Sequence, residues 1–273
     1  PKRTVPSSVT IGEDTIIVNS CAVTSEAVRQ TRQAIRRAHR ETPDKRIIVT
    51  GCAAQLDPQS FAAMPEVAKV IGNADKYRAA AFANENKVVI SDVMTAPAPP
   101  VAAGFLARVR SFVAIQTGCD HRCTFCSIWQ ARGASRSLPF EAVRDAVARE
   151  LEAGAKEIVL TGVDITSYDG GLGPLCQRLL AELPQLKRLR LSSLDSIEID
   201  GPLMELVASE PRLLPHFHLS LQAGDDLILK RMKRRHMRSD AIRFCRDVRA
   251  LRPDIAFGAD MIAGFPTETE EMF

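Results

Sequence analysis

Three cysteines, Cys119, Cys123 and Cys126, stand within eight residues in the stretch TGCDHRCTFC (117–126). Thiolates are ligands for zinc and for iron–sulfur clusters. A structural zinc site takes four ligands in a tetrahedron, but no second cysteine pair stands at zinc-finger distance, and His121 is badly placed between its neighbours to complete one. A cubane cluster spreads its ligands over separate irons, so three closely spaced thiolates suit it and leave one iron open for a small molecule. The spacing therefore favours an iron–sulfur cluster, with zinc as the alternative.

The composition indicates a globular protein from a reducing compartment. About 45% of the 273 residues are apolar, enough for one large domain or two ordinary ones. No apolar run reaches the length of a membrane span, and the first residues lack a signal-peptide core. The seven cysteines are odd in number and clustered, which favours metal or redox chemistry over disulfides. We expect a cytoplasmic protein without a membrane segment, and the first residue, Pro rather than Met, suggests a fragment.

Basic residues gather in two stretches, although the net charge is only +3. Residues 230–252 hold ten Lys/Arg and two Asp, a net +8, and are interpreted as a basic helix. Within 29–40 the arginines recur at helical spacing and form one face: Arg29, Arg32, Arg36, Arg37 and Arg40. A solvated helix face would explain either stretch alone. Two such faces on a nearly neutral chain favour a polyanionic partner, in particular nucleic acid.

The first third of the chain predicts a parallel-sheet α/β domain over residues 1–91. The β-branched runs 14–21, 46–52 and 87–91 predict strands. A helix is predicted from about Ser25 to Arg40, with Ser25 as its N-cap. Alternation of strand and helix is typical of a parallel sheet. Residues 92–104 are rich in Pro and Ala without periodicity, and are predicted to be a linker.

Alternation resumes over 105–273 and predicts a β/α barrel domain that is incomplete at its C-terminal end. Strands are predicted at 111–116, 157–162, 188–193, 216–221 and 255–262, and helices near 139–153, 172–183, 201–209 and 239–251. An open doubly wound sheet is the alternative topology. Chemistry in such folds collects beyond the carboxyl ends of the strands. Small or polar residues follow the successive strands there: the three cysteines, then Thr161, Gly162 and Asp164, then Ser192, Ser193 and Asp195, then Gln222, then Asp260.

The arrangement C-x3-C-x2-C after the first strand of a β/α barrel resembles the radical S-adenosylmethionine (SAM) enzymes. The wider motifs NSCAVT, TGCAAQ, LTGVDITSY, RLRLSSLDSIEID, HLSLQAGDDLILKRMKRRH and DMIAGFPTETEE resemble the methylthiotransferases of that group, from about residue 14 to the end. They are most similar to the tRNA enzymes that add a 2-methylthio group to N6-threonylcarbamoyladenosine beside the anticodon. The sequence departs from the family at Trp129, where a proline is more usual.

The resemblance implies roles for individual residues. Cys119, Cys123 and Cys126 would bind a [4Fe–4S] cluster whose open iron is chelated by SAM. One electron from the cluster would cleave SAM and produce a 5′-deoxyadenosyl radical. The SAM contacts of the family fall at Phe125, Gly162, Ser192, Gln222 and Ile262.

The resemblance also implies a second [4Fe–4S] cluster, which supplies sulfur, with Cys21 and Cys52 as ligands. Without the resemblance, the simpler interpretation is that Cys21 and Cys52 are buried cysteines that only contribute to packing. The family uses three cysteines there, and no cysteine precedes Cys21 in this chain. Cys176 and Cys245 lie inside helical patterns and are assigned to packing.

The partners implied are tRNA, a sulfur donor and a reducing electron donor of the flavodoxin or ferredoxin type. Arg132, Arg136 and the basic stretch 230–252 are candidate RNA contacts. Two other functions stay open at this point. One is the sister reaction on an aspartate of a ribosomal protein, and the other is a zinc-dependent RNA-binding module without catalysis.

Overall fold

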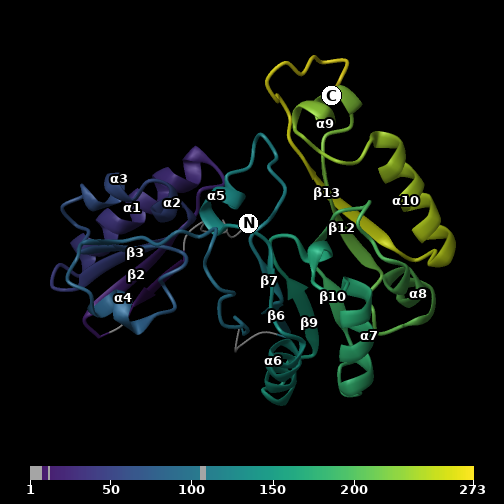
Figure 1. Ribbon diagram of the computed structural model, residues 1–273, viewed down its shortest axis with the longest axis horizontal. Coiled ribbons are helices and arrows are strands. Elements are labelled where there is room, and N and C mark those ends of the chain that lie inside the picture. Colours follow the sequence, from purple (N-terminus) through teal and green to yellow (C-terminus); the bar gives the residue numbers. More distant parts are fainter. Residues whose placement is uncertain (1–7, 12, 105–108) are drawn as a thin grey trace. The chain divides into compact units, whose positions relative to one another are not determined.

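The computed structural model describes residues 8–11, 13–104 and 109–273 of the chain. The contacts divide it into two compact units (Figure 1). The N-terminal unit holds the residues up to 99 together with 118–120 and 126–134, and the barrel unit holds 100–117, 121–125 and 135–273. The segment that follows the cysteine loop is therefore packed with the N-terminal unit.

A five-stranded sheet forms the centre of the N-terminal unit. Its order is β1 (Ser8–Ile11), β2 (Thr15–Ser20), β3 (Arg46–Gly51), β4 (Lys69–Ile71) and β5 (Val88–Val89). β1 pairs antiparallel with β2, and the other neighbours are parallel. The three predicted strands are confirmed as β2, β3 and β5. The sequence did not reveal β4, because three residues are too short for a periodic pattern.

The described part of this unit contains five helices: α1 (Ser25–Glu41), α2 (Cys52–Leu56), α3 (Pro58–Ala62), α4 (Ala79–Ala83) and α5 (Ile128–Arg132). The long α1 was predicted, but its N-cap is Thr24 and not Ser25. The Thr24 side chain accepts a hydrogen bond from the backbone N–H of Ala27 at 3.0 Å, which satisfies one of the orphan donors of the first turn. The apolar faces of sheet and helices meet in a core that includes Ile16, Ile35 and Phe61.

The barrel unit contains the five predicted strands in sequence order. β6 (Arg110–Ala114), β9 (Glu157–Thr161) and β10 (Leu189–Leu191) form one parallel sheet, and β11 (Ser193–Leu194), β12 (His216–Gln222) and β13 (Ala256–Met261) form another. β10 and β11 are two parts of the single strand predicted at 188–193. A short antiparallel pair, β7 (Gln116–Thr117) and β8 (Arg136–Ser137), flanks the cysteine loop.

The crossover helices lie where the sequence predicts them: α6 (Phe140–Glu152), α7 (Leu172–Glu182), α8 (Gly201–Ser209) and α10 (Arg238–Leu251), with a short 3-10 helix, η1 (Ile165–Ser167), and α9 (Asp226–Arg231) in addition. They cover the strands around one large apolar core, which contains Val113, Ile158, Leu191 and Phe217. Cys176 is fully buried in this core and Cys245 packs against it, as predicted, and burial raises the pKa of the Cys176 thiol.

The basic stretch 230–252 is not one helix, and this prediction was wrong. α9 ends at Arg231 and α10 begins at Arg238. Lys233 between them has a left-handed backbone (φ 59°), which a continuing α-helix cannot contain. Met232 and His236 are buried at 0% and 3% exposure, so the connection turns inward instead of presenting a uniform basic face.

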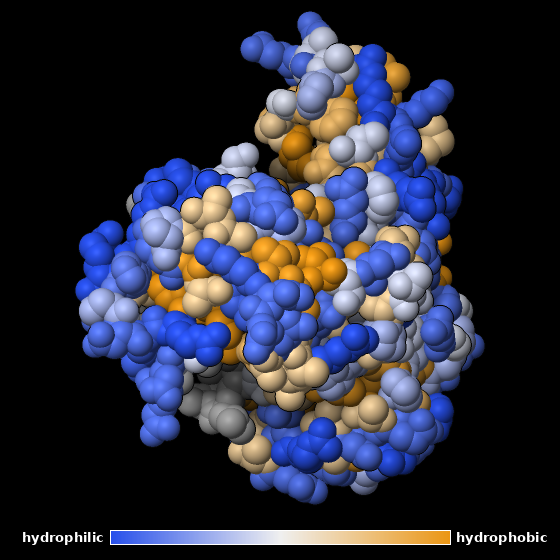
Figure 2. Space-filling model, turned by 60° about the vertical axis from the view of Figure 1, so that its left-hand side comes forward, coloured by the Kyte–Doolittle hydropathy of each residue, from blue (hydrophilic) through white to orange (hydrophobic). Residues whose placement is uncertain are grey.

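Hydrophilic side chains cover most of the face shown in Figure 2, with apolar residues gathered in smaller areas. Among the described residues, no helix is both long and apolar enough to cross a bilayer.

Candidate cofactor site at the strand ends

The cysteine loop begins directly after β7 and is held by its own backbone. The N–H of Cys119 donates to the carbonyl of Gly133 at 3.0 Å, and the N–H of Ile128 donates to the Cys126 sulfur at 3.4 Å. Gly118 has φ 77°, and a Cβ there would lie 1.8 Å from the carbonyl oxygen of Ala134. Only glycine fits that position. The structure thus fixes the entry and exit of the loop, and none of the described cysteines is in a disulfide.

Cys123 lies in the barrel unit beside a buried ion pair. Its side chain is 8% exposed, and its sulfur accepts a hydrogen bond from Arg234 Nη1 at 3.8 Å. The Nη2 atom of Arg234 donates to Asp195 Oδ2 at 2.9 Å and to the carbonyl of Ser220 at 2.6 Å. Both charged side chains are more than 90% buried. The guanidinium therefore connects this cysteine to the ends of β11 and β12.

Gln116 organises the loop after β9. Its side-chain oxygen accepts hydrogen bonds from the N–H groups of Val163 (3.0 Å) and Asp164 (2.9 Å), and its amide nitrogen donates to Ser135 Oγ at 2.8 Å. Gly162 packs against it, and a Cβ there would come within 2.9 Å of the Gln116 carbonyl oxygen and 3.0 Å of its side-chain oxygen. The predicted site residue Gly162 is thus required by close approach of the two segments.

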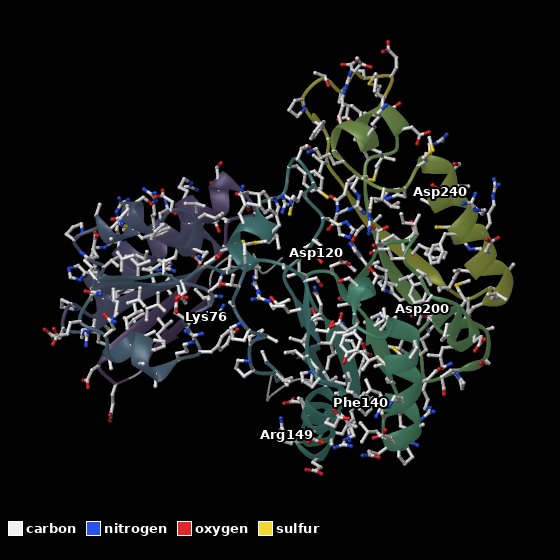
Figure 3. The ribbon with its side chains drawn as sticks, in the orientation of Figure 1. Lys76, Asp120, Phe140, Arg149, Asp200 and Asp240 are labelled. Atoms are coloured by element: carbon white, nitrogen blue, oxygen red, sulfur yellow. The ribbon has the colours of Figure 1, made fainter. Side chains whose placement is uncertain are left out.

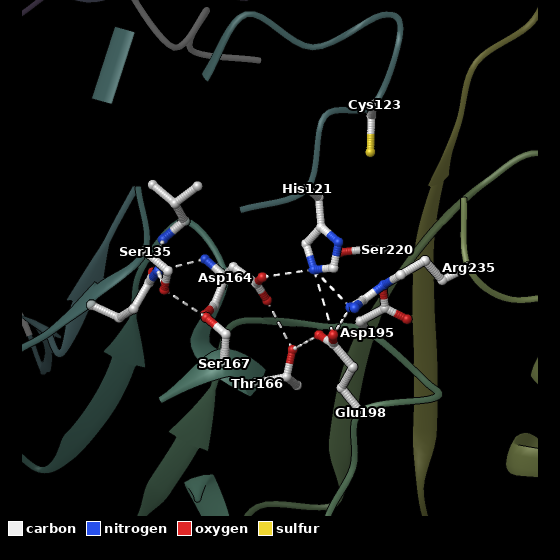
Figure 4. A network of polar contacts seen from close by, with 12 residues as sticks. His121, Cys123, Ser135, Asp164, Thr166, Ser167, Asp195, Glu198, Ser220 and Arg235 are labelled. Atoms are coloured by element: carbon white, nitrogen blue, oxygen red, sulfur yellow. Dashed lines mark hydrogen bonds and ion pairs between the residues drawn. The ribbon is translucent and has the colours of Figure 1, made fainter. Parts of the chain in front are cut away.

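A network of charged groups spans the carboxyl ends of the barrel strands (Figure 4). His121 Nε2 lies 3.0 Å from Asp164 Oδ2 and 3.4 Å from Glu198 Oε1. Thr166 Oγ1 is 2.9 Å from each of these two carboxylates. Arg235 Nη2 lies 2.8 Å from His121 Nε2 and also contacts Glu198. His121, between two of the cysteines, therefore joins a cation and two anions from three other loops.

The electrostatics of the network favour an ionised Asp164. Burial works against ionisation of this carboxyl group, but the hydrogen bonds from His121 and Thr166 outweigh burial and lower its pKa below the usual range. Two carboxylates face one arginine here, so an additional positive charge is favourable at this end of the barrel. A histidine nearby is kept neutral, since burial and then the charge of Arg234 lower the pKa of His236.

The other predicted SAM contacts, Ser192, Gln222, Ile262 and Phe125, differ in burial and in backbone conformation. Among the described residues, the hydroxyl oxygen of Ser192 is buried without a hydrogen-bond partner, and so is that of Ser196. Gln222 has a left-handed backbone with φ 72°, an uncommon state for a non-glycine residue, and its carbonyl accepts the N–H of Ile262 at 2.9 Å. The Ile262 side chain packs into a small apolar cluster, and Phe125 is 38% exposed.

Cys21 and Cys52 follow two neighbouring strands of the N-terminal sheet. The preceding residues, Ser20 and Gly51, are register partners in the parallel pair β2–β3, so both cysteines emerge at the same edge of the sheet. A cavity of about 320 Å³ in this unit is lined by residues that follow each cysteine, including Ala22 and Ala53. The structure thus brings these two predicted ligands to one place.

The sulfur of Cys52 lies among nitrogen donors. Arg132 Nε is 3.4 Å away and Asn73 Nδ2 3.6 Å away. Lys76 (Figure 3) donates to Asn73 Oδ1 at 3.0 Å. Burial, followed by repulsion from Arg132, lowers the pKa of Lys76 to about 8, against a smaller opposite effect of Cys52. Arg132, a predicted RNA contact, is therefore engaged with a cysteine.

Comparison with known proteins identifies the family. The model of the radical SAM superfamily matches residues 113–273, and that of an uncharacterized protein family, UPF0004, matches residues 7–72. The chain belongs to the radical SAM superfamily. Two solved structures of the radical SAM methyltransferase TsrM from Kitasatospora setae share this fold. The one with tryptophan and a SAM analogue bound has a TM-score of 0.69 at 14% identity, covering 94% of this chain and 57% of that one.

Curated relatives carry the names of enzymes that form 2-methylthio nucleosides in tRNA or transfer a methylthio group to it, which confirms the resemblance seen in the sequence. The threonylcarbamoyladenosine tRNA methylthiotransferase MtaB of Rickettsia prowazekii is 48% identical over 96% of this chain. The tRNA-2-methylthio-N(6)-dimethylallyladenosine synthase of Erythrobacter litoralis is 33% identical over 95%. The chain spans 64% of the first relative and 62% of the second.

The residues at the strand ends fit the cluster and the SAM that radical SAM membership implies. Three cysteines on one short loop, none of them in a disulfide in the described part of the chain, match the thiolate donors of a [4Fe–4S] cluster. Buried polar atoms without partners are rare in folded proteins. The hydroxyls of Ser192 and Ser196 and the Nε of Arg234 are such atoms among the described residues, as expected where a polar ligand belongs.

Several residues of the site were not found by sequence reasoning. Gln116, Arg234 and Glu198 gave no signal of their own, because a polar residue at a strand end or in a basic run has many ordinary explanations. His121 was considered only as a zinc ligand. Its position inside the cysteine motif was the available signal for a role in the site.

Proposed function

We propose that this chain is the SAM-cleaving and sulfur-carrying part of a radical SAM tRNA methylthiotransferase. It would add a 2-methylthio group to N6-threonylcarbamoyladenosine next to the anticodon, using two SAM and two [4Fe–4S] clusters. The observation that carries the proposal is the cysteine loop Cys119–Cys126 in a radical SAM domain, in a chain 48% identical to a relative with that name. The activity belongs to a longer protein in those relatives, and we propose it for this chain on that basis.

Each part of the site has a role in this proposal. Cys119, Cys123 and Cys126 would hold the barrel cluster, which supplies the electron that cleaves SAM. Gln116 fixes the loop 162–164 so that SAM can approach the backbone at Gly162. The ionised Asp164 offers a negative charge to the cationic ammonium or sulfonium of SAM. Ser192, Gln222, Ile262 and Phe125 would complete the SAM contacts.

The N-terminal unit would hold the second cluster through Cys21 and Cys52. Arg132 and Lys76 place positive charge around Cys52, which suits an anionic cluster and the sulfur that it carries. A cytoplasmic sulfur donor and a flavodoxin-type or ferredoxin-type reductant would serve the two clusters. The exposed basic residues of α1 and of the 230–238 region would contact the tRNA phosphates.

Arg235 supports the threonylcarbamoyl substrate over the dimethylallyl one. A threonylcarbamoyl group ends in a carboxylate, whereas a dimethylallyl group is apolar. In the described part of the chain, Arg235 uses only Nη2, for His121 and Glu198, and its side chain is 47% exposed. Its Nη1 and Nε donors and its charge are available to a substrate carboxylate. The apolar dimethylallyl group offers this guanidinium neither a charge nor a hydrogen-bond acceptor.

The test compares two tRNA substrates. The protein is reconstituted anaerobically with iron and sulfide, and then incubated with SAM, a strong reductant and tRNA that carries either N6-threonylcarbamoyladenosine or N6-dimethylallyladenosine. We expect 5′-deoxyadenosine and the methylthiolated nucleoside with the first tRNA only. The variant Cys119→Ala/Cys123→Ala/Cys126→Ala should form neither, and Cys245→Ser serves as the control. Methylthiolation of a ribosomal-protein aspartate, or zinc in place of iron and acid-labile sulfide, would contradict the proposal.

A further inference from the structure

We propose that Arg234 is a positioning residue for the barrel cluster. Its guanidinium donates a hydrogen bond to the Cys123 thiolate and thereby raises the reduction potential of the cluster. The inference rests on the proposed function, because it needs Cys123 to be a cluster ligand. Neither the superfamily match nor the relatives' names assign a role to this arginine.

The position of Arg234 is fixed by three acceptors. Its Nη2 bonds Asp195 Oδ2 at 2.9 Å and the Ser220 carbonyl at 2.6 Å, and its Nη1 lies 3.8 Å from Cys123 Sγ. The side chain is 8% exposed and that of Asp195 6%. A guanidinium with two of its bonds taken by the ends of β11 and β12 has little freedom to turn away from the sulfur. The Nη1 group of the guanidinium therefore points at Cys123, the proposed cluster ligand.

The backbone around this contact is also tied to the cysteine loop. The N–H of Thr124 donates to the carbonyl of Met232 at 3.2 Å, and the Thr124 hydroxyl donates to the carbonyl of Arg231 at 3.0 Å. These bonds join the residue after Cys123 to the turn that precedes Arg234. The turn includes Lys233 with its positive φ of 59°, which redirects the chain so that Arg234 points inward. The basic stretch therefore turns inward at the point where Arg234 bonds Asp195 and Cys123.

The consequence for the cluster follows from electrostatics. Reduction adds a negative charge to the cluster, and a nearby cation and N–H donor stabilise the reduced state more than the oxidised state. The effect is enlarged by burial, because screening by water is weak there. Asp195 opposes it, but its carboxylate is bonded to Nη2 while Nη1 is the atom nearest the sulfur. The guanidinium should therefore dominate at Cys123.

The test measures the potential of the barrel cluster alone. The full chain carrying Cys21→Ala and Cys52→Ala is reconstituted anaerobically, and the reduced cluster is quantified by electron paramagnetic resonance at poised potentials. With Arg234→Gln, we expect about a tenfold lower ratio of reduced to oxidised cluster at a fixed potential, which for a one-electron couple is a shift of about 59 mV. Arg234→Lys keeps the charge without the fork and should lose less, about threefold.

Two further variants make the result decisive. Arg212 has partners of the same kinds, the carboxylate of Glu210 at 2.7 Å and the carbonyl of Leu180 at 3.0 Å, and Arg212→Gln should leave the ratio unchanged. Asp195→Asn removes the opposing negative charge and should raise the ratio of reduced to oxidised cluster. This variant therefore tests the inference even if Arg234→Gln does not retain a cluster. An unchanged potential in Arg234→Gln, or a lowered ratio in Asp195→Asn, would overturn the inference.

The two proposals fail in different ways. If the parent chain forms no cluster that can be reduced, the proposed function is wrong. If the parent forms a cluster that cleaves SAM, and the Arg234 and Asp195 variants titrate with it, only the role of Arg234 is lost.

Discussion

A sulfur atom accepts a hydrogen bond from an arginine in each unit, but the two arginines stand in different electrostatic surroundings. Beside Cys123, the guanidinium of Arg234 is paired with the buried carboxylate of Asp195. Beside Cys52, Arg132 lies close enough to Lys76 for the two cations to repel, and burial and this repulsion lower the pKa of Lys76 to about 8. One site is balanced by the chain itself, while the other gathers positive charge.

The difference indicates what each site lacks. A balanced ion pair keeps its geometry whether or not a cluster is bound, so the Cys123 region is arranged in advance of the proposed cluster. A half-buried lysine beside an arginine costs stability until an anion binds nearby. An anionic cluster, or the sulfur bound to it, would supply that charge at Cys52. The comparison thus predicts that the barrel unit loses stability when a charge is removed, and the N-terminal unit gains it.

The largest effect is expected when the balanced pair is broken. Asp195→Ala leaves Arg234 buried without its carboxylate, which typically costs about 3–5 kcal/mol. Denaturant unfolding of the cluster-free chain measures it. Asp145→Ala is the control, because the Asp145–Arg144 pair has exposures of 54% and 35% and exposed pairs contribute under about 1 kcal/mol. Equal losses in the two variants would show that the buried pair is not distinctive.

Removing a charge from the other site should stabilise the cluster-free chain. Lys76→Met eliminates a cation whose folded pKa of about 8 lies below the ordinary lysine value of 10.5. Between these two values the unfolded chain binds more protons than the folded one, so wild-type stability rises with pH through this window. Below about pH 8 the variant should be more stable by on the order of 2 kcal/mol, and the advantage should shrink as the pH rises toward the unfolded pKa.

Unfolding curves of the wild type and of Lys76→Met across this pH range test whether the stability advantage of the variant shrinks as the pH rises. Lys87→Met, at an exposed lysine of the same unit, should show no such window. Loading the second cluster should reduce the advantage of Lys76→Met, since an anion then compensates the lysine. An advantage that grows with pH would contradict the account of the Cys52 site.

A smaller effect tests whether the barrel site also depends on packing. A methyl group at Gly162 would meet Ile165 Cγ2 at 2.8 Å and the Gln116 carbonyl at 2.9 Å, and would push the 162–164 loop from its place. Gly162→Ala should weaken SAM binding about tenfold, or about 1.4 kcal/mol, in the reconstituted protein measured by equilibrium dialysis. Gly201→Ala is the control, as no heavy atom lies within 4 Å of a Cβ there. Equal affinities would mean that the loop adapts freely.

The smallest effect concerns the outer part of the basic stretch. Arg234 faces the interior, but Lys230 and Lys233 are exposed, so they are the better candidates for binding phosphates. Lys230→Gln/Lys233→Gln should reduce the slope of log affinity for tRNA against log salt by about 0.7–0.9 for each phosphate that a lysine no longer neutralises. Arg149→Gln, on the barrel helix α6 (Figure 3), is the control. An unchanged slope would mean that the two lysines are only solvated.

The sequence by itself determined most of the elements and pointed to the proposed principal ligands. Strands and helices repeat with periods of two and 3.6 residues, so β2, β3, the five barrel strands and four crossover helices were visible in short windows. The three-cysteine spacing is equally local, and it indicated the type of cluster without knowledge of the fold. The register of β2 and β3, which only the structure shows, places Cys21 and Cys52 at one sheet edge.

The tertiary structure alone decided which polar residues meet. Arg234 is 111 residues from Cys123, and Arg235 is 114 from His121. In the sequence both arginines belonged to a run that was interpreted as a surface helix. Whether a charged side chain turns inward depends on a partner that compensates its burial, and that partner, Asp195, comes from another strand end. Periodicity within one segment carries no information about such a pairing, because the free energy that fixes it arises only when the distant loops fold together.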